Sequence, residues 1–362
     1  MGEHIMRHLA LAVSIIFTPS YLIAQSSQGM KAGLGQEVPS VTLEFGKAAP
    51  TALGNREAVM SANYICADDG SIFLEIAETL DNTMLVLHAL KGPSEDVRFL
   101  PGKIHGYGTI SFPLKYFVND YNVAALVEAD YEINSLEENA HEDSTAHLVL
   151  IYDRKGVLQN VVTIPPGIDV KSIGLYRSGD LLIVAINRSS NTASLFVLDN
   201  KGNIKHKFLL FDNDYNRNAK TEQPLADLIP DGALAFLQII PHGENLLLFP
   251  QMTSHEILEV NESGVVRSVH LQLPAGATLA SFLSSTDTSW KIKTIAKTDA
   301  KGILHEGPVY EFNSSDGSLI RRIDMPNGAR ATLACEHDGE YTALTTEENT
   351  GRLEFLSGSI SK

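Results

Sequence analysis

Short apolar runs broken by polar, glycine-centred turns recur along most of this chain. In one form, an apolar run ends in Asp or Asn, crosses a turn that contains glycine, and resumes as alternating apolar residues. This form occurs at His147–Leu158, Ala193–Ile204, Ile257–Val266 and Val309–Ile320. Each copy predicts two antiparallel strands joined by a tight turn, because glycine readily adopts the positive φ that such turns require.

A second pattern lies upstream of most of these hairpins and again predicts a strand, a turn and a strand. Clear copies lie at Ile65–Ile76, Gly174–Val184, Ile239–Phe249 and Leu333–Leu344, and weaker ones at Tyr116–Leu126 and Phe282–Lys293. Together the two patterns define units of four short strands that recur roughly every 45 to 65 residues, as propeller blades do. The mature chain has no sustained 3.6-residue apolar period, so we expect little helix.

The copies of the upstream pattern predict one all-β domain, a six-bladed β-propeller of four-stranded antiparallel blades. The last unit has only three strands, near residues 331–336, 341–346 and 352–356. The segment Ser40–Phe45 is a spare strand ahead of the first unit. We expect this N-terminal strand to pair into the last blade and close the ring, because closure removes exposed sheet edges.

In this repeat architecture the chain resembles the six-bladed β-propellers of the NHL-like and TolB-like kind. The resemblance covers residues 40–362 and rests on the four-stranded units. The diagnostic motifs of other propellers are absent, namely the Trp-Asp dipeptide, the Kelch glycine pair and the Tyr-Trp-Thr-Asp signature. The resemblance therefore implies a fold, and fold alone is weak evidence for function.

The start of the chain has the pattern of a secretory signal peptide. Arg7 and His8 precede an apolar run that ends at Ala24, and polar residues follow. A basic start, an apolar stretch and a small residue at the cleavage point are typical of such peptides. We expect a secreted or periplasmic protein with no membrane insertion of the mature chain, since no later stretch has the roughly 18 apolar residues of a membrane span. The expected parts are a signal peptide (1–24), a short linker (25–39) and one propeller domain (40–362).

Composition narrows the choice of partner. Hydrophobic residues make up 44% of the chain, which agrees with a packed core. The net charge is −16 and is spread along the sequence. Because such a surface repels phosphate backbones, we expect no nucleic-acid partner, which leaves an unknown protein or a small molecule.

Polar residues recur at one register of the predicted blades, eight positions after a turn glycine. These residues are Glu78, Asn187, Gln251 and Glu347, with Lys297 as a loose counterpart in the fifth blade. They would lie on the face that carries the longer loops, where binding residues on rigid scaffolds concentrate. We interpret them as candidate ligand-binding residues. The alternative is that strands simply become polar where they leave the core.

One acidic loop has the oxygen donors that Ca²⁺ prefers. Asp212, Asp214 and Asn216 stand at alternate positions, as in an EF-hand, but Arg217 replaces the glycine of its sharp turn. An irregular calcium site and a solvated acidic loop both remain open. The segment Glu137–His147 mixes histidines with carboxylates and leaves the same two alternatives. No other cofactor is indicated.

The chain has two cysteines, Cys66 and Cys335, too few for a disulfide scaffold or a multi-cysteine zinc site. Each stands four residues before its turn glycine, in the first and last predicted blades, which are neighbours in a closed ring. In an oxidising compartment they could form a disulfide across the closure. They could also be two buried thiols that pack as small apolar groups.

No catalytic motif is recognisable, because nucleophile-elbow, phosphate-loop, zinc-protease and dinucleotide patterns are all absent. We therefore interpret the chain as a module that binds a ligand or protein at its loop-rich face, with no evident catalysis. The alternative is a divalent-metal-dependent hydrolase or lactonase with its site at the mouth of the central channel. Six-bladed lactonases, which the chain resembles only in fold, hold a metal there. A purely structural module is a third interpretation.

Overall fold

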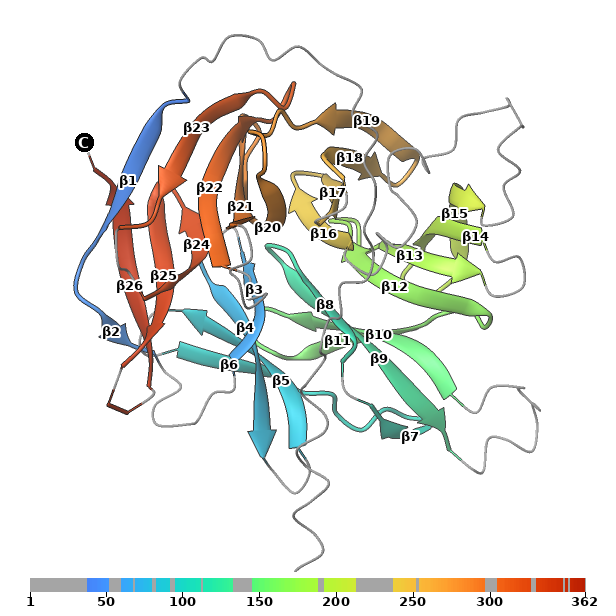
Figure 1. The fold of residues 1–362 in the computed structure, drawn as a ribbon. Helices are drawn as coiled ribbons and strands as arrows, with labels where there is room; N and C mark the ends of the chain where they lie inside the picture. Colours follow the sequence, from blue (N-terminus) through green and yellow to red (C-terminus); the bar gives the residue numbers. More distant parts are fainter. Residues whose placement is uncertain are drawn as a thin grey trace, which may run out of the picture. The chain divides into compact units, whose positions relative to one another are not determined.

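The computed structural model describes most of the chain, and Figure 1 shows how its strands are arranged. The described residues are 38–51, 60–67, 69–79, 83–91, 95–111, 113–132, 145–187, 192–212, 237–251, 254–296, 305–326, 330–347, 349–350 and 352–361. The expected signal peptide, nearly all of the expected linker, Lys297, Asp214 and Asn216 lie outside these residues.

Strands that follow one another in sequence pair antiparallel to build small sheets. Three sheets have four strands each, in the orders β3-β4-β5-β6, β12-β13-β14-β15 and β16-β17-β18-β19. Their bounds are β3 Met60–Cys66, β4 Ile72–Thr79, β5 Thr83–Lys91, β6 Glu95–Phe99, β12 Ile168–Leu175, β13 Leu181–Asn187, β14 Thr192–Leu198, β15 Ile204–Asp212, β16 Leu237–His242, β17 Asn245–Pro250, β18 Glu256–Asn261 and β19 Gly264–His270.

A fourth sheet has five strands, because two short strands share one neighbour. Its order is β11-β10-β9, and β7 and β8 both pair with β9. The bounds are β7 Tyr107–Ile110, β8 Lys115–Val118, β9 Asn122–Tyr131, β10 Thr145–Asp153 and β11 Leu158–Thr163. The weak sequence pattern at Tyr116–Leu126 thus corresponds to the β8–β9 hairpin, and β7 is an additional strand.

The hairpin turns have the chemistry that the sequence predicts. The turn glycines Gly70, Gly156, Gly179, Gly202, Gly243, Gly264, Gly317 and Gly339 all have positive φ. In the β14–β15 turn, Oδ1 of Asp199 accepts the backbone N–H groups of Lys201 and Asn203, both at 2.9 Å. A side chain that satisfies turn amides in this way stabilises the turn locally, so the hairpins depend little on distant contacts.

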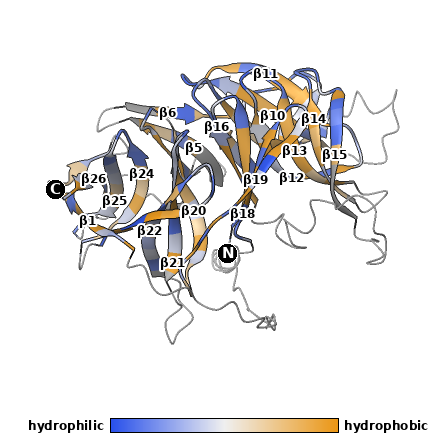
Figure 2. Ribbon diagram, turned by 90° about the horizontal axis from the view of Figure 1, so that it is seen from above, coloured by the Kyte–Doolittle hydropathy of each residue, from blue (hydrophilic) through white to orange (hydrophobic). Residues whose placement is uncertain are grey.

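The sheet of β12–β15 is buried on both faces at its second strand. In β13, Leu181, Leu182, Ile183, Val184 and Ala185 are all at most 1% exposed, although successive side chains of a strand point to opposite faces. Apolar side chains of the neighbouring sheets therefore pack against this sheet. In Figure 2 the ribbons of β13 and β14 are coloured mainly as hydrophobic. A sheet with two apolar faces must lie between two neighbouring sheets.

Six of the described strands each begin an antiparallel series of strands, and we call them the first strands. Most of them lie next to one another. β12 contacts β8 and β16, and β16 contacts β20 (Thr278–Ser285). β20 contacts β24 (Thr332–His337), which in turn contacts β3. These first strands surround a common centre (Figure 1), so the small antiparallel sheets have a propeller-like arrangement.

The N-terminal strand β1 (Ser40–Phe45) pairs with β26 (Leu353–Ile360), the last strand of the chain. Leu43 lies opposite Ile360 and Phe45 opposite Gly358, in an antiparallel register. This pairing agrees with the closure that the sequence predicts. The last strand begins where expected, near residue 352, and runs several residues further.

The sequence predicts six separate blades, but the described strands form five sheets, and four of these have the size of a single blade. Four sheets of four or five strands are separate, and the remaining strands form one nine-stranded sheet of order β20-β21-β22-β23-β1-β26-β25-β24, with β2 (Ala49–Pro50) beside β26. The other bounds are β21 Ser289–Ala296, β22 His305–Asn313, β23 Leu319–Asp324 and β25 Glu340–Thr346. The physical reason is that β1 bonds on both edges, because Ser40–Thr42 also pair in parallel with β23.

Strands are the regular elements throughout the described residues, which confirms for them the expectation of little helix. In this part of the chain, no helix has the length and apolar character that crossing a membrane requires.

Candidate functional site

A cavity of about 650 Å³ lies where the first strands of the sheets meet. Side chains from β3, β8, β12, β16, β20 and β24 line it, and β4 and β21 add residues from the second row of strands. This volume lies within the range of roughly 300–1,000 Å³ that is usual for small-molecule sites.

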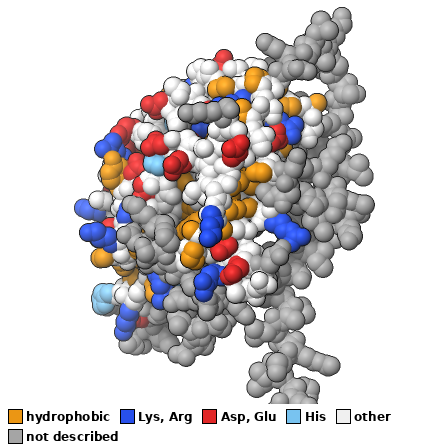
Figure 3. Space-filling view, turned by 90° about the vertical axis from the view of Figure 1, so that its left-hand side faces the viewer, with side chains coloured by type: hydrophobic (Ala, Val, Ile, Leu, Met, Phe, Trp, Pro, Cys, Tyr) orange, Lys and Arg blue, Asp and Glu red, His pale blue; other side chains and the backbone are white. Residues whose placement is uncertain are grey.

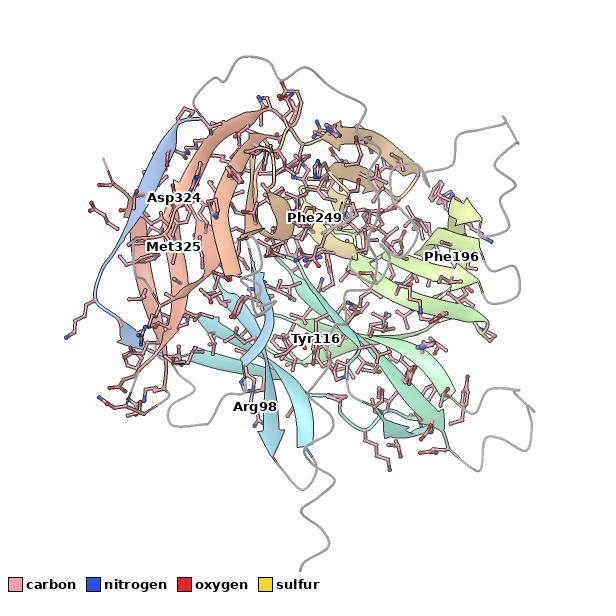
Figure 4. The ribbon with its side chains drawn as sticks, in the orientation of Figure 1. Arg98, Tyr116, Phe196, Phe249, Asp324 and Met325 are labelled. Carbon is pink, nitrogen blue, oxygen red and sulfur yellow. A yellow bond between two sulfur atoms is a disulfide. The ribbon has the colours of Figure 1, made fainter. Side chains whose placement is uncertain are left out.

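Aromatic rings and polar side chains both line the cavity wall. The rings are Tyr64, Tyr116, Phe117 and Phe282, and the polar groups include Ser172, Gln238, Gln251, Ser281 and Ser284. Tyr116 belongs to β8, and Figure 4 shows it near the centre of the arrangement. Such a wall suits a molecule with both apolar surface and hydrogen-bonding groups.

A chain of buried charges reaches the cavity between β21 and β24. Nζ of Lys291 lies 3.0 Å from Oε2 of Glu336 and 3.9 Å from Oε1 of Glu311. Glu311 in turn pairs with Arg321 on β23. Lys291, Glu336 and Glu311 are each at most 7% exposed, so this polar network is part of the interior.

Glu336 is held in its ionised form. Burial alone would raise the pKa of its carboxyl group, but hydrogen bonding from Ser284 and the charge of Lys291 outweigh burial, so the pKa lies below its ordinary value. The backbone N–H of Gly339 also donates to Oε1, at 2.9 Å. A carboxylate stabilised by three partners is a weak base, so the contact with Ser284 does not make that hydroxyl an activated nucleophile.

A second buried lysine, Lys293, is also fully engaged. Its Nζ lies 2.8 Å from Oε1 of Glu306 and donates to the carbonyl oxygen of Leu333, also at 2.8 Å. The same ammonium lies 5.6 Å from the ring centre of Tyr64, on β3. Because Lys291 and Lys293 are two residues apart on β21, both point to the face of the sheet that meets β24.

Glu75 differs from these paired groups. It stands on β4, lines the cavity, and no hydrogen bond or ion pair with another described residue reaches its carboxyl group. Burial raises the pKa of this carboxyl group above its ordinary value, and the charge of Lys115 offsets part of the rise.

The candidate ligand-binding residues that the sequence suggests lie at different places in the structure. Gln251 lines it, where its amide donates to Oε1 of Gln238 at 3.2 Å. Glu347 instead lies in the turn after β25, where its carboxylate accepts a hydrogen bond from Thr350 at 2.6 Å. Glu78 lies near the end of β4 and Asn187 at the end of β13.

The predicted metal site falls at the edge of the described chain. Asp212 is the last residue of β15, where it lies opposite Thr192. Among the described residues, no three His, Cys, Asp or Glu side chains are grouped so as to hold a metal ion.

Cys66 and Cys335 are joined as a disulfide, with their Cα atoms 5.0 Å apart. The bond links β3 to β24, two neighbouring first strands that are 269 residues apart in sequence. Cys66 also lines the cavity, so the disulfide forms part of its wall.

Sequence reasoning missed Glu75, Lys291, Lys293 and Glu336. Each is a charged residue within an apolar strand, as in the run Trp290-Lys-Ile-Lys293. A charged residue at such a position indicates either a buried ion pair or a binding site, because burying an unpaired charge is costly.

The sequence matches no known protein family and no curated protein. Solved structures that resemble the fold include a protein of unknown function from Bacteroides caccae (TM-score 0.38, 12% identity, 73% of this chain and 82% of that one). Another is a catalytically inactive virginiamycin B lyase from Staphylococcus aureus with quinupristin (TM-score 0.40, 13% identity, 87% of this chain and 99% of that one). A third is an exo-β-1,3-galactanase from Clostridium thermocellum (TM-score 0.34, 10% identity, 84% of this chain and 87% of that one). The description of the fold therefore rests on the strand pairing of this chain itself.

Proposed function

We propose that this chain is an exported six-bladed β-propeller that binds a small molecule in its central cavity. The observation that carries the proposal is the cavity of about 650 Å³, which the first strands of the sheets line together. Pockets of this size with aromatic walls and a few converging polar groups are the usual form of small-molecule sites.

The count of six follows from how the nine-stranded sheet is divided. Its strands β20–β23 form one antiparallel series and β24–β26 another, and β1 joins the outer edges of the two. Both β20 and β24 line the cavity, as β3, β8, β12 and β16 do. Counting one blade for each of these first strands gives six blades.

The disulfide supports export. Disulfides persist in oxidising compartments and are rare in the cytosol, so the bond between Cys66 and Cys335 fits a secreted or periplasmic protein. The mass of the purified mature protein tests this directly. Export with cleavage predicts an N-terminus just after Ala24, whereas an intact N-terminus on the active protein contradicts it.

Binding fits the cavity better than catalysis does. The buried charges Lys291, Lys293 and Glu336 are each satisfied by protein partners, as structural networks are. A general base or nucleophile needs a group whose proton affinity is poised for transfer, and ionised Glu336 lacks this property. These three groups therefore stabilise the interior rather than react.

A matched pair of variants tests the cavity as the site. Ser281→Phe places a ring in the cavity wall, and Ser357→Phe makes the same change at an exposed position of β26. We expect some compounds of a small-molecule library to raise the melting temperature of the wild type and of Ser357→Phe, because a ligand that binds only the folded state stabilises it. Ser281→Phe should lose this response. Equal responses in both variants, or no response in any protein, would overturn the proposal.

A further inference from the structure

The charged groups on the cavity wall differ in whether the protein satisfies them. Lys291 and Glu336 pair with each other, and Lys293 pairs with Glu306. At the exposed end of the cavity, Nε2 of His337 lies 3.4 Å from Oδ2 of Asp338. Among the described residues of the wall, the carboxyl group of Glu75 has neither a hydrogen bond nor an ion pair.

The surroundings of Glu75 make this lack of a partner costly. Glu75 belongs to β4, whose neighbouring residues Phe73 and Leu74 are at most 3% exposed. Lys115, on β8, influences the carboxyl group through its charge but is exposed and forms no ion pair with it. A half-buried carboxylate without a hydrogen-bond partner loses hydration, and the charge of Lys115 offsets only part of that loss, so a donor that entered the cavity would supply the missing hydrogen bond.

An aromatic ring shares the cavity wall with the same carboxyl group. Tyr116 on β8 and Glu75 on β4 both line the cavity, and the negative charge of Glu75 contributes, after burial, to a raised pKa of the Tyr116 hydroxyl group. Tyr116 and Tyr64 both line the cavity. A carboxylate beside aromatic faces is the combination that binds organic ammonium groups, through a charge-assisted hydrogen bond and cation–π attraction.

The charge of the whole chain points to the same class of ligand. Its net charge of −16 attracts cations toward the protein. On the face shown in Figure 3, acidic and basic side chains are interspersed, so the acidic excess is not gathered there in one patch. A single carboxylate is a poor metal site, since Ca²⁺ takes about six to eight oxygen ligands.

We propose that Glu75 is the anchor of the cavity and binds the ammonium group of an amine ligand, with Tyr116 against the cation. The inference rests on the proposed binding function and names its ligand class. The ligand is an organic amine with an apolar portion, which the rings of Phe117 and Phe282 on the same wall accommodate.

Two probes with one carbon skeleton test this inference, namely 2-phenylethylamine and 2-phenylethanol. Calorimetric titration of the full mature protein at neutral pH should show binding of the amine about tenfold or more tighter than binding of the alcohol, as one charge-assisted contact provides. Glu75→Gln keeps the shape of the side chain and should bring the two affinities together. Glu354→Gln, on β26 and outside the cavity wall, should keep the preference for the amine.

The outcomes separate the anchor from the cavity. If the wild type binds amine and alcohol equally and Ser281→Phe loses both, the cavity binds ligands but Glu75 is not the anchor. A preference for the amine that survives in Glu75→Gln also overturns the inference. If neither probe binds while other library compounds do, the ligand class is wrong and the binding function stands. If no compound binds at all, both proposals fail. The wild-type comparison decides the ligand class even if Glu75→Gln does not fold.

Discussion

Gly317 packs directly against the backbone carbonyl group of His270, a residue at the end of the preceding sheet. A Cβ atom at Gly317 would lie 2.1 Å from that oxygen, and the glycine also has a φ of +71°. The two strands are linked here by a hydrogen bond from the N–H of Gln272 to the carbonyl oxygen of Gly317, at 2.9 Å. A Cβ atom at Gly202 would likewise lie 2.4 Å from the backbone carbonyl oxygen of Thr163, in the sheet that precedes it. The outer turns therefore set how closely successive sheets approach.

Replacing Gly317 by alanine should destabilise the protein strongly. The new Cβ atom forces the turn away from a backbone oxygen that cannot move freely, and it adds the strain of a positive φ. We expect a loss of about 2–3 kcal/mol in the free energy of unfolding. Chemical denaturation followed by circular dichroism measures it.

Gly179→Ala is the matched control, because Gly179 has a φ of +92° but no atom within 4 Å of its would-be Cβ. This variant should lose only the conformational part, about 1 kcal/mol. Equal losses in the two variants would show that the close approach to His270 carries no energy of its own.

The closing strand should be needed for stability. Leu43 on β1 is 1% exposed and packs in a cluster with Ile323 and Leu333, on β23 and β24. Leu43→Ala removes apolar contacts with both series of strands that β1 joins, so we expect a loss of about 2–4 kcal/mol. Thr42→Ala, at an exposed position of the same strand, should change the free energy of unfolding by less than about 0.5 kcal/mol. Thermal unfolding of the two variants side by side checks the difference.

The hairpins could be predicted from the sequence because their determinants are local. Asp199 accepts amide hydrogens only two and four residues further on, and the turn glycine stands between them. The pairing of β1 with β26 could also be predicted, since a spare strand at one end and a missing strand at the other leave complementary edges. The second pairing of β1, with β23, could not, because nothing in residues 40–42 distinguishes one exposed edge from another.

The cavity wall could be predicted much less well, because which side chains converge depends on how neighbouring sheets face each other. Lys291 acquires its partner Glu336 from another series of strands. Gln251 and Glu347 share one register in sequence, yet Gln251 lines the cavity while Glu347 is held by Thr350 in its own turn. Two positions that are equivalent in the sequence repeat therefore have different surroundings in the structure.

The disulfide between Cys66 and Cys335 should contribute measurably to stability. It restricts the unfolded chain across a sequence separation of 269 residues, so we expect the Cys66→Ala/Cys335→Ala variant to lose about 2–5 kcal/mol. Reductant should lower the melting temperature of the wild type toward that of the variant and leave the variant unchanged. Two free thiols in the purified protein, counted by mass after alkylation without reductant, would contradict the bond.

Glu336 should make the protein sensitive to acid. Its pKa in the folded protein lies below the ordinary value of 4.5, despite burial, because Ser284 and Lys291 stabilise the ionised carboxylate. A lowered carboxyl pKa means that the folded state binds fewer protons than the unfolded state. The stabilisation is therefore fully present above about pH 4.5 to 5 and is lost as the pH falls through the folded pKa.

Glu336→Gln isolates this contribution. At neutral pH the variant leaves Lys291 with only Glu311, at 3.9 Å, so we expect a loss of about 3 kcal/mol, the lower end for breaking a buried pair. The difference in unfolding free energy between wild type and variant should shrink steadily from pH 5 to pH 3, as Glu336 of the wild type takes up its proton. Glu354→Gln, on β26 and outside this charge network, serves as the control and should follow the wild-type pH profile. A wild-type-minus-variant difference that stays constant over this range would mean that folding does not lower the carboxyl pKa of Glu336, and a difference that grows as the pH falls would mean that this carboxyl group is protonated in the folded protein.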